Sequence, residues 1–231
     1  MTSSVKRYTV AVLGLGVRGK IHLRGLLENP DRYQVVGLCD RDESVAQKVA
    51  EEYGLTQIPL FTDAEQLLST VRPDIFVFVT YPSDRLNMVE LAVRYGVKGI
   101  SLEKPMAESL QEAKVMRDLC HQHGIKAVVC HQQKYLSQMR RMKQRIEAGE
   151  IGEIRKIHVE TQAWFSQLGT HYVDYTLWIN GGHPAKWVVG HVHGPATLED
   201  SHPAPDYLLG TMELKNGVRA YIECGYLSEA H

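Results

Sequence analysis

The stretch TVAVLGLGVRGKIHLRGLLE (9–28) contains the motif around which the rest of the chain is best understood. A run of apolar residues leads into GLGVRG (14–19), which matches G-x-G-x-x-G, and a helical pattern follows directly. In this motif Gly14 permits a tight turn, Gly16 lets a pyrophosphate approach the backbone, and Gly19 lets the helix sit close to the strand. Strand, glycine turn and helix in this order predict a dinucleotide-binding loop rather than a purely structural turn.

The predicted cofactor follows from the residues around this loop. Free N–H groups at Val17 and Arg18, at the start of the helix, would face the phosphates. The second apolar run, VVGLCD (35–40), ends in Asp40, whose carboxylate can accept hydrogen bonds from a ribose 2′-hydroxyl and would repel a 2′-phosphate. This favours NAD. Arg18 and Arg41 could each reach a phosphate, so NADP remains possible.

Composition sets the broad class of the protein. The chain has 231 residues, 44% hydrophobic and 23% charged, with a net charge of −1, which fits one large or two modest globular domains. There is no basic excess for nucleic acid, and no apolar stretch approaches the roughly 18 residues of a membrane helix. The widely spaced cysteines suggest free thiols in a reducing compartment. A soluble cytoplasmic protein with no membrane or nucleic-acid partner is therefore expected. The four cysteines are Cys39, Cys120, Cys130 and Cys224.

Two domains are predicted, 1–131 and 132–231. The first alternates apolar runs with helical patterns, which is typical of a Rossmann-type, doubly wound parallel sheet of the α/β class. Its further strands are expected at 75–80, 99–104 and 126–131. The second domain is predicted to be α+β with an open, mainly antiparallel sheet. Its expected elements are a basic helix at 137–152, a strand at 154–165, a helix at 170–181, and strands at 185–194 and 207–226 with a two-residue turn at Asn216-Gly217.

The ends of the predicted parallel strands supply candidate ligand residues, because ligands of doubly wound sheets bind beyond the carboxyl ends of the strands. Thr80, Tyr81 and Pro82 follow one strand and are predicted to line the nicotinamide–ribose pocket. The same loop is equally compatible with a helix start capped by Ser83.

SLEKPMA (101–107) places a charged pair at the end of another strand. Pro105 disfavours the helical conformation for Lys104, which predicts an extended lysine aimed outward from the strand end. A partly desolvated lysine can exchange a proton with a substrate hydroxyl, and Glu103 can orient it or bind a ribose. The structural alternative is a surface salt bridge at a strand end.

Taken together, five motifs resemble the Gfo/Idh/MocA oxidoreductases. They are GLGVRG (14–19), Asp40, EKP (103–105), AGEIGEI (148–154) and LGTHYVDYTLWI (168–179). The resemblance implies a Rossmann domain plus a domain with a large open sheet that often serves oligomerisation. It also implies NAD(P)-dependent oxidation or reduction at a sugar-type carbinol. Members of this family are usually longer, so the second domain is expected to be incomplete.

The resemblance also assigns roles in the second domain. His171 and Asp174 are i and i+3 on one helix, so the histidine has a candidate acidic partner. His171 falls on the family's catalytic histidine, whereas Gln167 stands where an aspartate is often found. Glutamine cannot titrate, so proton transfer is expected to rest on Lys104 and His171, with Gln167 hydrogen-bonding substrate. A half-buried structural histidine is the alternative.

Two further residues are assigned to the site, and two other functions stay open. His131 could face the cofactor, and Trp164 could line a sugar pocket or pack in the core. His191 and His193 have a metal-type spacing, but no carboxylate or cysteine completes a set, so no metal is predicted. A non-catalytic dinucleotide-binding regulator, which Gln167 would favour, and an NAD-dependent glycoside hydrolase of the same fold are the alternatives.

Overall fold

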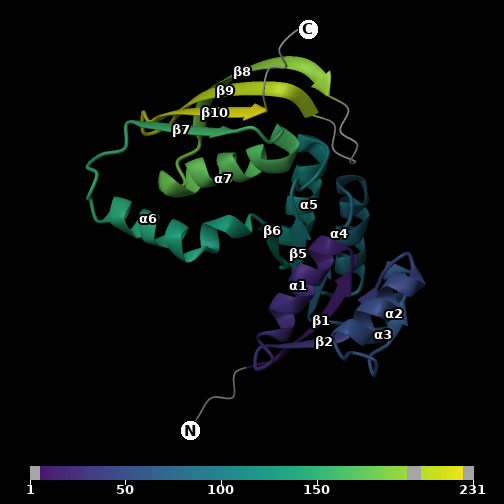
Figure 1. Cartoon of the computed structure of the whole chain (residues 1–231). Coiled ribbons are helices and arrows are strands. Elements are labelled where there is room, and N and C mark those ends of the chain that lie inside the picture. The colour runs from purple at the N-terminus through teal and green to yellow at the C-terminus, as the bar shows by residue number, and fades with distance from the viewer. Residues whose placement is uncertain (1–5, 197–203, 226–231) are drawn as a thin grey trace. The chain divides into compact units, whose positions relative to one another are not determined.

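A computed structural model describes residues 6–196 and 204–225 of the chain (Figure 1). The backbone separates into two compact units, 1–130 and 131–231. Within the described residues, no helix combines the length and the apolar character that crossing a membrane requires.

The first unit is built on a six-stranded sheet in the order β3-β2-β1-β4-β5-β6, with every neighbouring pair parallel. This confirms the predicted doubly wound α/β fold. The strands are β1 (Tyr8–Leu13), β2 (Tyr33–Cys39), β3 (Leu60–Phe61), β4 (Ile75–Phe78), β5 (Gly99–Glu103) and β6 (Lys126–Cys130). The helices are α1 (Val17–Leu27), α2 (Glu43–Glu52), α3 (Ala64–Val71), α4 (Arg85–Arg94) and α5 (Leu110–Gln122), with a 3₁₀ turn η1 (Pro82–Asp84).

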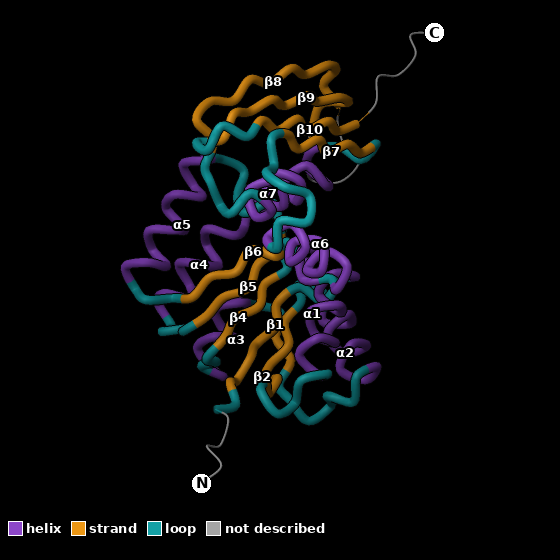
Figure 2. The backbone as a smooth tube through the Cα atoms, turned by 90° about the vertical axis from the view of Figure 1, so that its left-hand side faces the viewer, coloured by secondary structure: helices purple, strands orange, loops and turns teal. Residues whose placement is uncertain are grey.

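Helices cover both faces of this sheet, and Figure 2 shows α3, α4 and α5 on one side with α1 and α2 on the other. Successive strand residues point to opposite faces, so β1 contributes Ala11 to one core and Val12 to the other. Phe76 and Val77 of β4 divide in the same way. This two-sided burial explains why the strands are continuous apolar runs rather than alternating ones.

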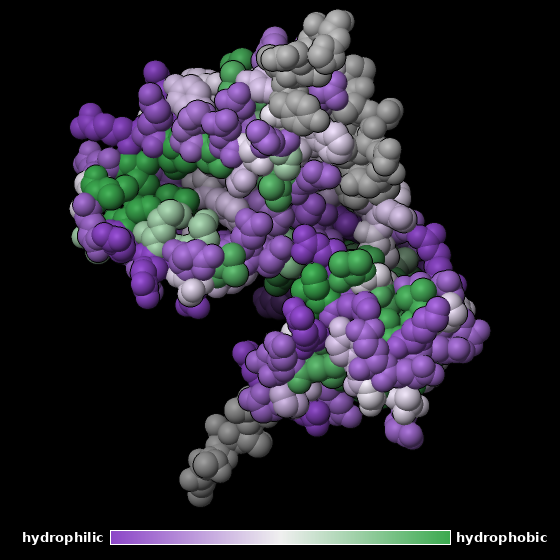
Figure 3. All heavy atoms as spheres, in the orientation of Figure 1, coloured by the Kyte–Doolittle hydropathy of each residue, from purple (hydrophilic) through white to green (hydrophobic). Residues whose placement is uncertain are grey.

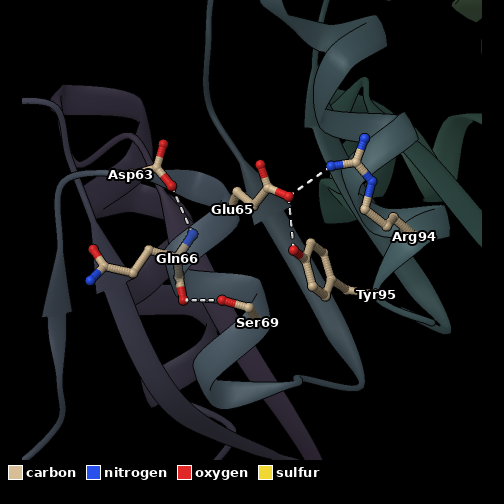
Figure 4. A network of polar contacts seen from close by, with 6 residues as sticks. All are labelled: Asp63, Glu65, Gln66, Ser69, Arg94 and Tyr95. Atoms are coloured by element: carbon tan, nitrogen blue, oxygen red, sulfur yellow. Dashed lines mark hydrogen bonds and ion pairs between the residues drawn. The ribbon is translucent and has the colours of Figure 1, made fainter.

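The N-terminus of α3 and the end of α4 are joined by a polar network at the surface (Figure 4). Asp63 caps α3 by accepting a hydrogen bond from the Gln66 N–H at 2.7 Å. Glu65 accepts from Arg94 Nη1 at 2.7 Å and from the Tyr95 hydroxyl at 2.9 Å. These contacts are exposed, so they add little stability beyond helix capping.

The second unit holds a four-stranded sheet in the order β7-β10-β9-β8. The β8, β9 and β10 pairings are antiparallel and the β7–β10 pairing is parallel, which confirms the predicted open, mainly antiparallel sheet. The strands are β7 (Lys156–Thr161), β8 (Ala185–Ala196), β9 (Ala204–Leu214) and β10 (Arg219–Gly225). The helical elements are η2 (Gln132–Tyr135), α6 (Ser137–Glu147), the π-helical turn η3 (Phe165–Gly169) and α7 (Thr170–Ile179).

Helix α7 supplies apolar side chains to the core of this unit. Val173 and Leu177 pack in the cluster built on buried residues of β9 and β10, including Leu214 and Ile222. At the other end of α7, Asn180 and Asn216 exchange side-chain hydrogen bonds of 3.0 Å in both directions. This amide pair ties the end of α7 to the turn between β9 and β10.

That turn differs from the predicted two-residue connection. Glu213 pairs with Arg219, and the N–H of Gly217 donates to the carbonyl of Leu214 at 2.8 Å. Gly217 has φ +86°, whereas Asn216 keeps an ordinary negative φ. The connection is therefore longer than the predicted turn, with only the glycine in the left-handed region, because a type I′ turn would need positive φ at both residues.

Candidate active site

The glycine loop between β1 and α1 is closely packed at two of its three glycines. A Cβ on Gly14, which has φ +81°, would lie 2.3 Å from the carbonyl oxygen of Val79. A Cβ on Gly19 would lie 1.8 Å from the carbonyl oxygen of Gly14. Gly16 has nothing within 4 Å of its Cβ position. A side chain at Gly14 or Gly19 would therefore clash with the backbone, while Gly16 leaves an open approach to the backbone.

Among the described residues, no side chain caps the N-terminus of α1. The first turn of this helix contains no acidic residue. Helices α2 and α5 differ, because Asp42 and Ser109 accept hydrogen bonds from their first-turn N–H groups. The N-terminus of α1 is thus suited to bind an anion such as a pyrophosphate, through its N–H groups and the positive end of the helix dipole.

Asp40 follows β2 and is fixed against the glycine loop. Its Oδ2 accepts the Leu15 N–H at 2.7 Å, and its Oδ1 accepts the Asp42 N–H at 3.1 Å. A carboxylate has about four lone-pair sites, so two remain for ribose hydroxyls. Of the two nearby cations, Arg41 lies 3.7 Å from Asp84 and Arg18 is exposed. The residues around the loop therefore fit an adenine-side ribose and a pyrophosphate.

Beyond β4, the Thr80 loop is held by Arg85, which the sequence analysis did not single out. The Arg85 side chain is buried and donates from Nε at 3.2 Å and Nη2 at 2.7 Å to the carbonyl of Thr80. Burial lowers the pKa of Arg85 to about 10. Arg85 Nη1 and Thr80 Oγ1 are buried without a hydrogen-bond partner, whereas Tyr81 is exposed and Pro82 is buried. These unused polar atoms suit a polar ligand or a water at this strand end.

Glu103, at the end of β5, is buried and bonded to a residue of α1. His22 Nε2 lies 3.0 Å from Glu103 Oε1, and Cys130 at the end of β6 places its sulfur within 4.8 Å of both ligand atoms. Burial lowers the pKa of His22, but hydrogen bonds and charge attraction from Cys130 and Glu103 outweigh it and raise the pKa to about 9. Burial raises the pKa of Glu103, but His22, Arg18 and Lys104 bring it below its ordinary value. His22 and Glu103 therefore form an ion pair at neutral pH.

This ion pair predicts a pH-dependent stability. The pKa of His22 rises from 6.5 when unfolded to about 9 when folded, so its contribution is fully present below pH 6.5 and is lost as the pH rises to 9. Urea unfolding measured at pH 6 and at pH 9.5 gives the free energy of unfolding at each pH. Between the two, the wild type should lose roughly 3 kcal/mol more of this free energy than His22→Gln does. A matched variant of an exposed histidine, His121→Gln, should follow the wild type. Equal losses in the wild type and His22→Gln would contradict the ion pair.

Lys104 follows directly after Glu103 and is half-buried. It therefore lies at the same carboxyl edge of the sheet as the glycine loop, Asp40 and the Thr80 loop, since the carboxyl ends of parallel strands meet there. The peptide bond between Lys104 and Pro105 is cis.

In the second unit, His171 is buried in α7. Its Nδ1 lies 3.1 Å from the Tyr175 hydroxyl, and its ring stacks edge-on against His131 at 5.0 Å. Asp174 forms an ion pair of 2.9 Å with Lys134 of η2. The i, i+4 neighbour Tyr175 is thus one partner of His171, and Asp174 has a cationic partner in Lys134.

Gln167 and Trp164 belong to the turn that leads into α7. Gln167 lies within η3, its N–H donating to the carbonyl of Trp164 at 3.0 Å, and both side chains are half-buried. Single π-helical turns recur at functional sites, where they displace side chains from regular helical positions. His131, Trp164, Gln167 and His171 belong to the second unit, whereas the strand-end residues belong to the first.

Comparison with known proteins assigns both units to one group. Residues 8–131 match the family described as "Oxidoreductase family, NAD-binding Rossmann fold", and residues 139–231 match "GFO/IDH/MocA C-terminal domain". The chain belongs to the GFO/IDH/MocA oxidoreductase family. This confirms the resemblance found in the sequence motifs.

Relatives within the family include sugar dehydrogenases. The chain is 30% identical over 152 residues to a D-apiose dehydrogenase of Paraburkholderia graminis, covering 65% of this chain and 39% of that protein. It is 24% identical to a D-glucoside 3-dehydrogenase of Escherichia coli, covering 98% and 72%. The fold matches the WlbA dehydrogenase from Bordetella pertussis, solved in complex with NADH and UDP-GlcNAcA, with a TM-score of 0.82, 21% identity, and coverage of 98% and 73%.

One surface pocket of this family member lies within the second unit. It is formed along α6 and the loop after it, where Figure 3 shows hydrophobic residues reaching the surface. Its lining includes Met142, Ile146 and Ile151 among basic neighbours. None of the candidate catalytic or cofactor residues lines it, so it does not belong to the candidate site.

Metal-type ligands gather in two places among the described residues. One group is His22, Glu103 and Cys130; the other is His158, Glu160 and Glu223 on β7 and β10. His191 and His193, which have the metal-type spacing in the sequence, are exposed on β8 and belong to neither group. Spacing along one strand thus did not indicate where such ligands converge.

Proposed function

We propose that this protein transfers a hydride between NAD and a carbinol of a sugar, polyol or related small molecule. The proposal rests mainly on the strand-end arrangement of the first unit, where an uncapped helix N-terminus, an open Gly16, Asp40 and Lys104 share one edge of the sheet. NAD bound there would accept or donate the hydride. The chain spans 39% and 72% of the two curated relatives described above, so their activities enter here as support only.

The first-unit residues then have distinct roles. Val17, Arg18 and the glycines would hold the pyrophosphate, and Asp40 would bind the adenosine ribose. The loop at 80–82, with the unused Thr80 hydroxyl, would contact the nicotinamide ribose. Lys104 would exchange the proton of the substrate hydroxyl, with Glu103 held in place by His22.

The second unit would supply the substrate-facing residues. His171 would act as a second proton-transfer group, with its imidazole oriented by the Tyr175 hydroxyl. Gln167 would hydrogen-bond the substrate, and Trp164 would cover an apolar face of a sugar ring. His131, in ring contact with His171, would face the cofactor.

Cofactor preference is proposed to favour NAD over NADP. Asp40 holds its carboxylate at the loop through two backbone hydrogen bonds, so it cannot swing away from a 2′-phosphate. Arg41, the cation best placed to compensate, is near Asp84 instead. Charge repulsion at the ribose should therefore disfavour the phosphorylated cofactor.

The direct test mixes the protein with NAD or NADP and a panel of sugars and polyols while absorbance at 340 nm is followed. An increase with NAD and at least one polyol is expected, with NADP at least tenfold less effective. Cofactor binding without turnover on any substrate would overturn the enzymatic proposal and favour a regulatory protein, which Gln167 in place of an acid would explain. Release of phenol from an aryl glycoside without net NADH would instead indicate a glycoside hydrolase.

Assembly and location are proposed on separate grounds. Strand β8 exposes Val188, Val189 and Val192, which suits a homo-oligomer formed through the second-unit sheet. Light scattering that shows a monomer would contradict this. None of the four cysteines forms a disulfide in this structure, which suits a reducing cytoplasm. Efficient export of the native protein would argue against that location.

A further inference from the structure

Three elements of the first unit bring a thiol, an imidazole and a carboxylate together. His22 comes from α1, Glu103 from the end of β5 and Cys130 from the end of β6. Their nitrogen, oxygen and sulfur atoms all lie within 4.8 Å of one another, and His22 also hydrogen-bonds both partners. Such an arrangement, with a base beside the nucleophile and a third group orienting the base, is the pattern of an activated thiol.

Several positively charged groups act on this cluster. Arg18, Lys104 and Arg85 act on Glu103, so the carboxylate does not leave a net negative field around the thiol. The bond to Glu103 helps to keep the proton on His22, whose pKa is raised to about 9. A thiol beside a protonated histidine and further cations is the environment in which cysteines react.

The other cysteines of the chain lack these features. Cys39, Cys120 and Cys224 are buried in hydrophobic cores. Burial raises the pKa of all three thiols, to about 12 for Cys39 and about 11 for Cys224. Cys130 is only half-buried at the end of its strand, so a small reagent can reach its sulfur more easily than those of the three buried cysteines.

We propose that Cys130 is a modification site for peroxides, activated by His22 and oriented through Glu103. With its proton held on His22, the Cys130 sulfur attacks one oxygen of hydrogen peroxide. The S–O bond forms as the O–O bond breaks, so that sulfur is oxidised by two electrons and the peroxide is reduced. The leaving hydroxide takes the proton from His22 and departs as water, giving a sulfenic acid and a neutral imidazole.

A metal ion is the competing use of the same three atoms, since histidine, cysteine and glutamate are all zinc ligands. A divalent cation would have to displace the His22 proton beside Arg18, Arg85 and Lys104. Those charges repel a cation, so the electrostatics disfavour a metal ion at these three atoms. This inference is independent of the proposed redox activity, because it concerns the cluster alone.

The test treats the native protein with hydrogen peroxide in the presence of dimedone, which traps sulfenic acids, and measures labelling of each cysteine by mass spectrometry. Cys130 should be labelled at least tenfold faster than Cys39, Cys120 or Cys224. It should also be labelled faster than the same cysteine in a synthetic peptide of residues 126–134. Exposure alone cannot make the thiol of the folded protein react faster than the fully exposed thiol of an unfolded peptide. Labelling at or below the peptide rate would overturn the proposal.

Variants then test the role of the histidine. His22→Gln should slow labelling of Cys130 at least fivefold, whereas His121→Gln, at an exposed position on α5, should leave it unchanged. Cys39 serves as a fold reporter in every variant, because its labelling stays low while the core is intact. An unchanged Cys130 rate in a folded His22→Gln protein would contradict activation by His22. If that variant unfolds, the comparison of the wild-type protein with the peptide still tests whether Cys130 is activated.

Discussion

Replacing Lys104 with alanine is expected to lower kcat/KM by about 10²- to 10⁴-fold, the usual contribution of a positioned acid or base. The residue follows Glu103 at the sheet edge that also holds the glycine loop, so its loss should remove proton transfer from a site that still binds cofactor. The dissociation constant for NAD, measured by fluorescence titration, should change less than about threefold, or about 0.6 kcal/mol.

Two further variants separate proton transfer from charge. Lys104→Arg keeps a cation that cannot lose its proton, so its activity should stay close to that of the alanine variant. Lys114→Ala removes an exposed lysine on α5 and should behave as the wild type. If Lys104→Ala keeps more than a tenth of wild-type activity, the lysine is not the proton-transfer group. An equal loss of NAD affinity would indicate a cofactor-binding role instead.

Gly19→Ala is expected to destabilise the protein by about 1–3 kcal/mol or more, because overpacking a closely packed site typically costs this much. The new Cβ would lie 1.8 Å from the Gly14 carbonyl oxygen. The backbone fixes the position of the Cβ, and the carbonyl oxygen is itself a backbone atom. No side-chain rotation can therefore relieve the clash, and either β1 or α1 must shift. Urea unfolding followed by circular dichroism measures the loss.

Two other glycines of the same segment provide matched controls. Gly25 lies inside α1 with nothing within 4 Å of its Cβ position, so Gly25→Ala should raise stability by roughly 0.5–1 kcal/mol through helix propensity. Gly16→Ala should leave stability nearly unchanged but weaken NAD binding at least tenfold, since the new methyl group occupies the open approach to the backbone. A Gly16→Ala protein that binds NAD normally would contradict the pyrophosphate position, and a fully stable Gly19→Ala protein would contradict the packing.

Much of the first unit could be predicted because its signals are local and repeated. The apolar runs ending at Cys39 and Phe78 became buried parallel strands, and their ends carry Asp40 and Thr80. The strand β3 was missed because two residues, Leu60 and Phe61, show no periodicity. It forms because its backbone pairs with β2, which no pattern within two residues can indicate.

Side-chain partners were harder to predict than elements. Helical spacing placed Asp174 on the same face as His171, but it did not indicate that Lys134, far away in sequence, forms an ion pair with this carboxylate. Helical spacing defines which residues share a face, whereas charge attraction across elements decides which of them pair. The prediction of a two-residue turn at Asn216-Gly217 was wrong for a similar reason. The dipeptide indicates a turn, but the register of the two strands sets the length of the connection.

The amino-acid sequence was sufficient for the order of elements, the glycine loop and the residues at the strand ends, because hydrophobic periodicity and turn chemistry act over a few neighbouring residues. It was insufficient for the cluster of His22, Glu103 and Cys130. These residues lie far apart in the chain and meet because α1, β5 and β6 pack together. Hydrogen bonds and charge attraction from Cys130 and Glu103 then raise the pKa of His22, and the same contacts underlie the proposed reactivity of Cys130.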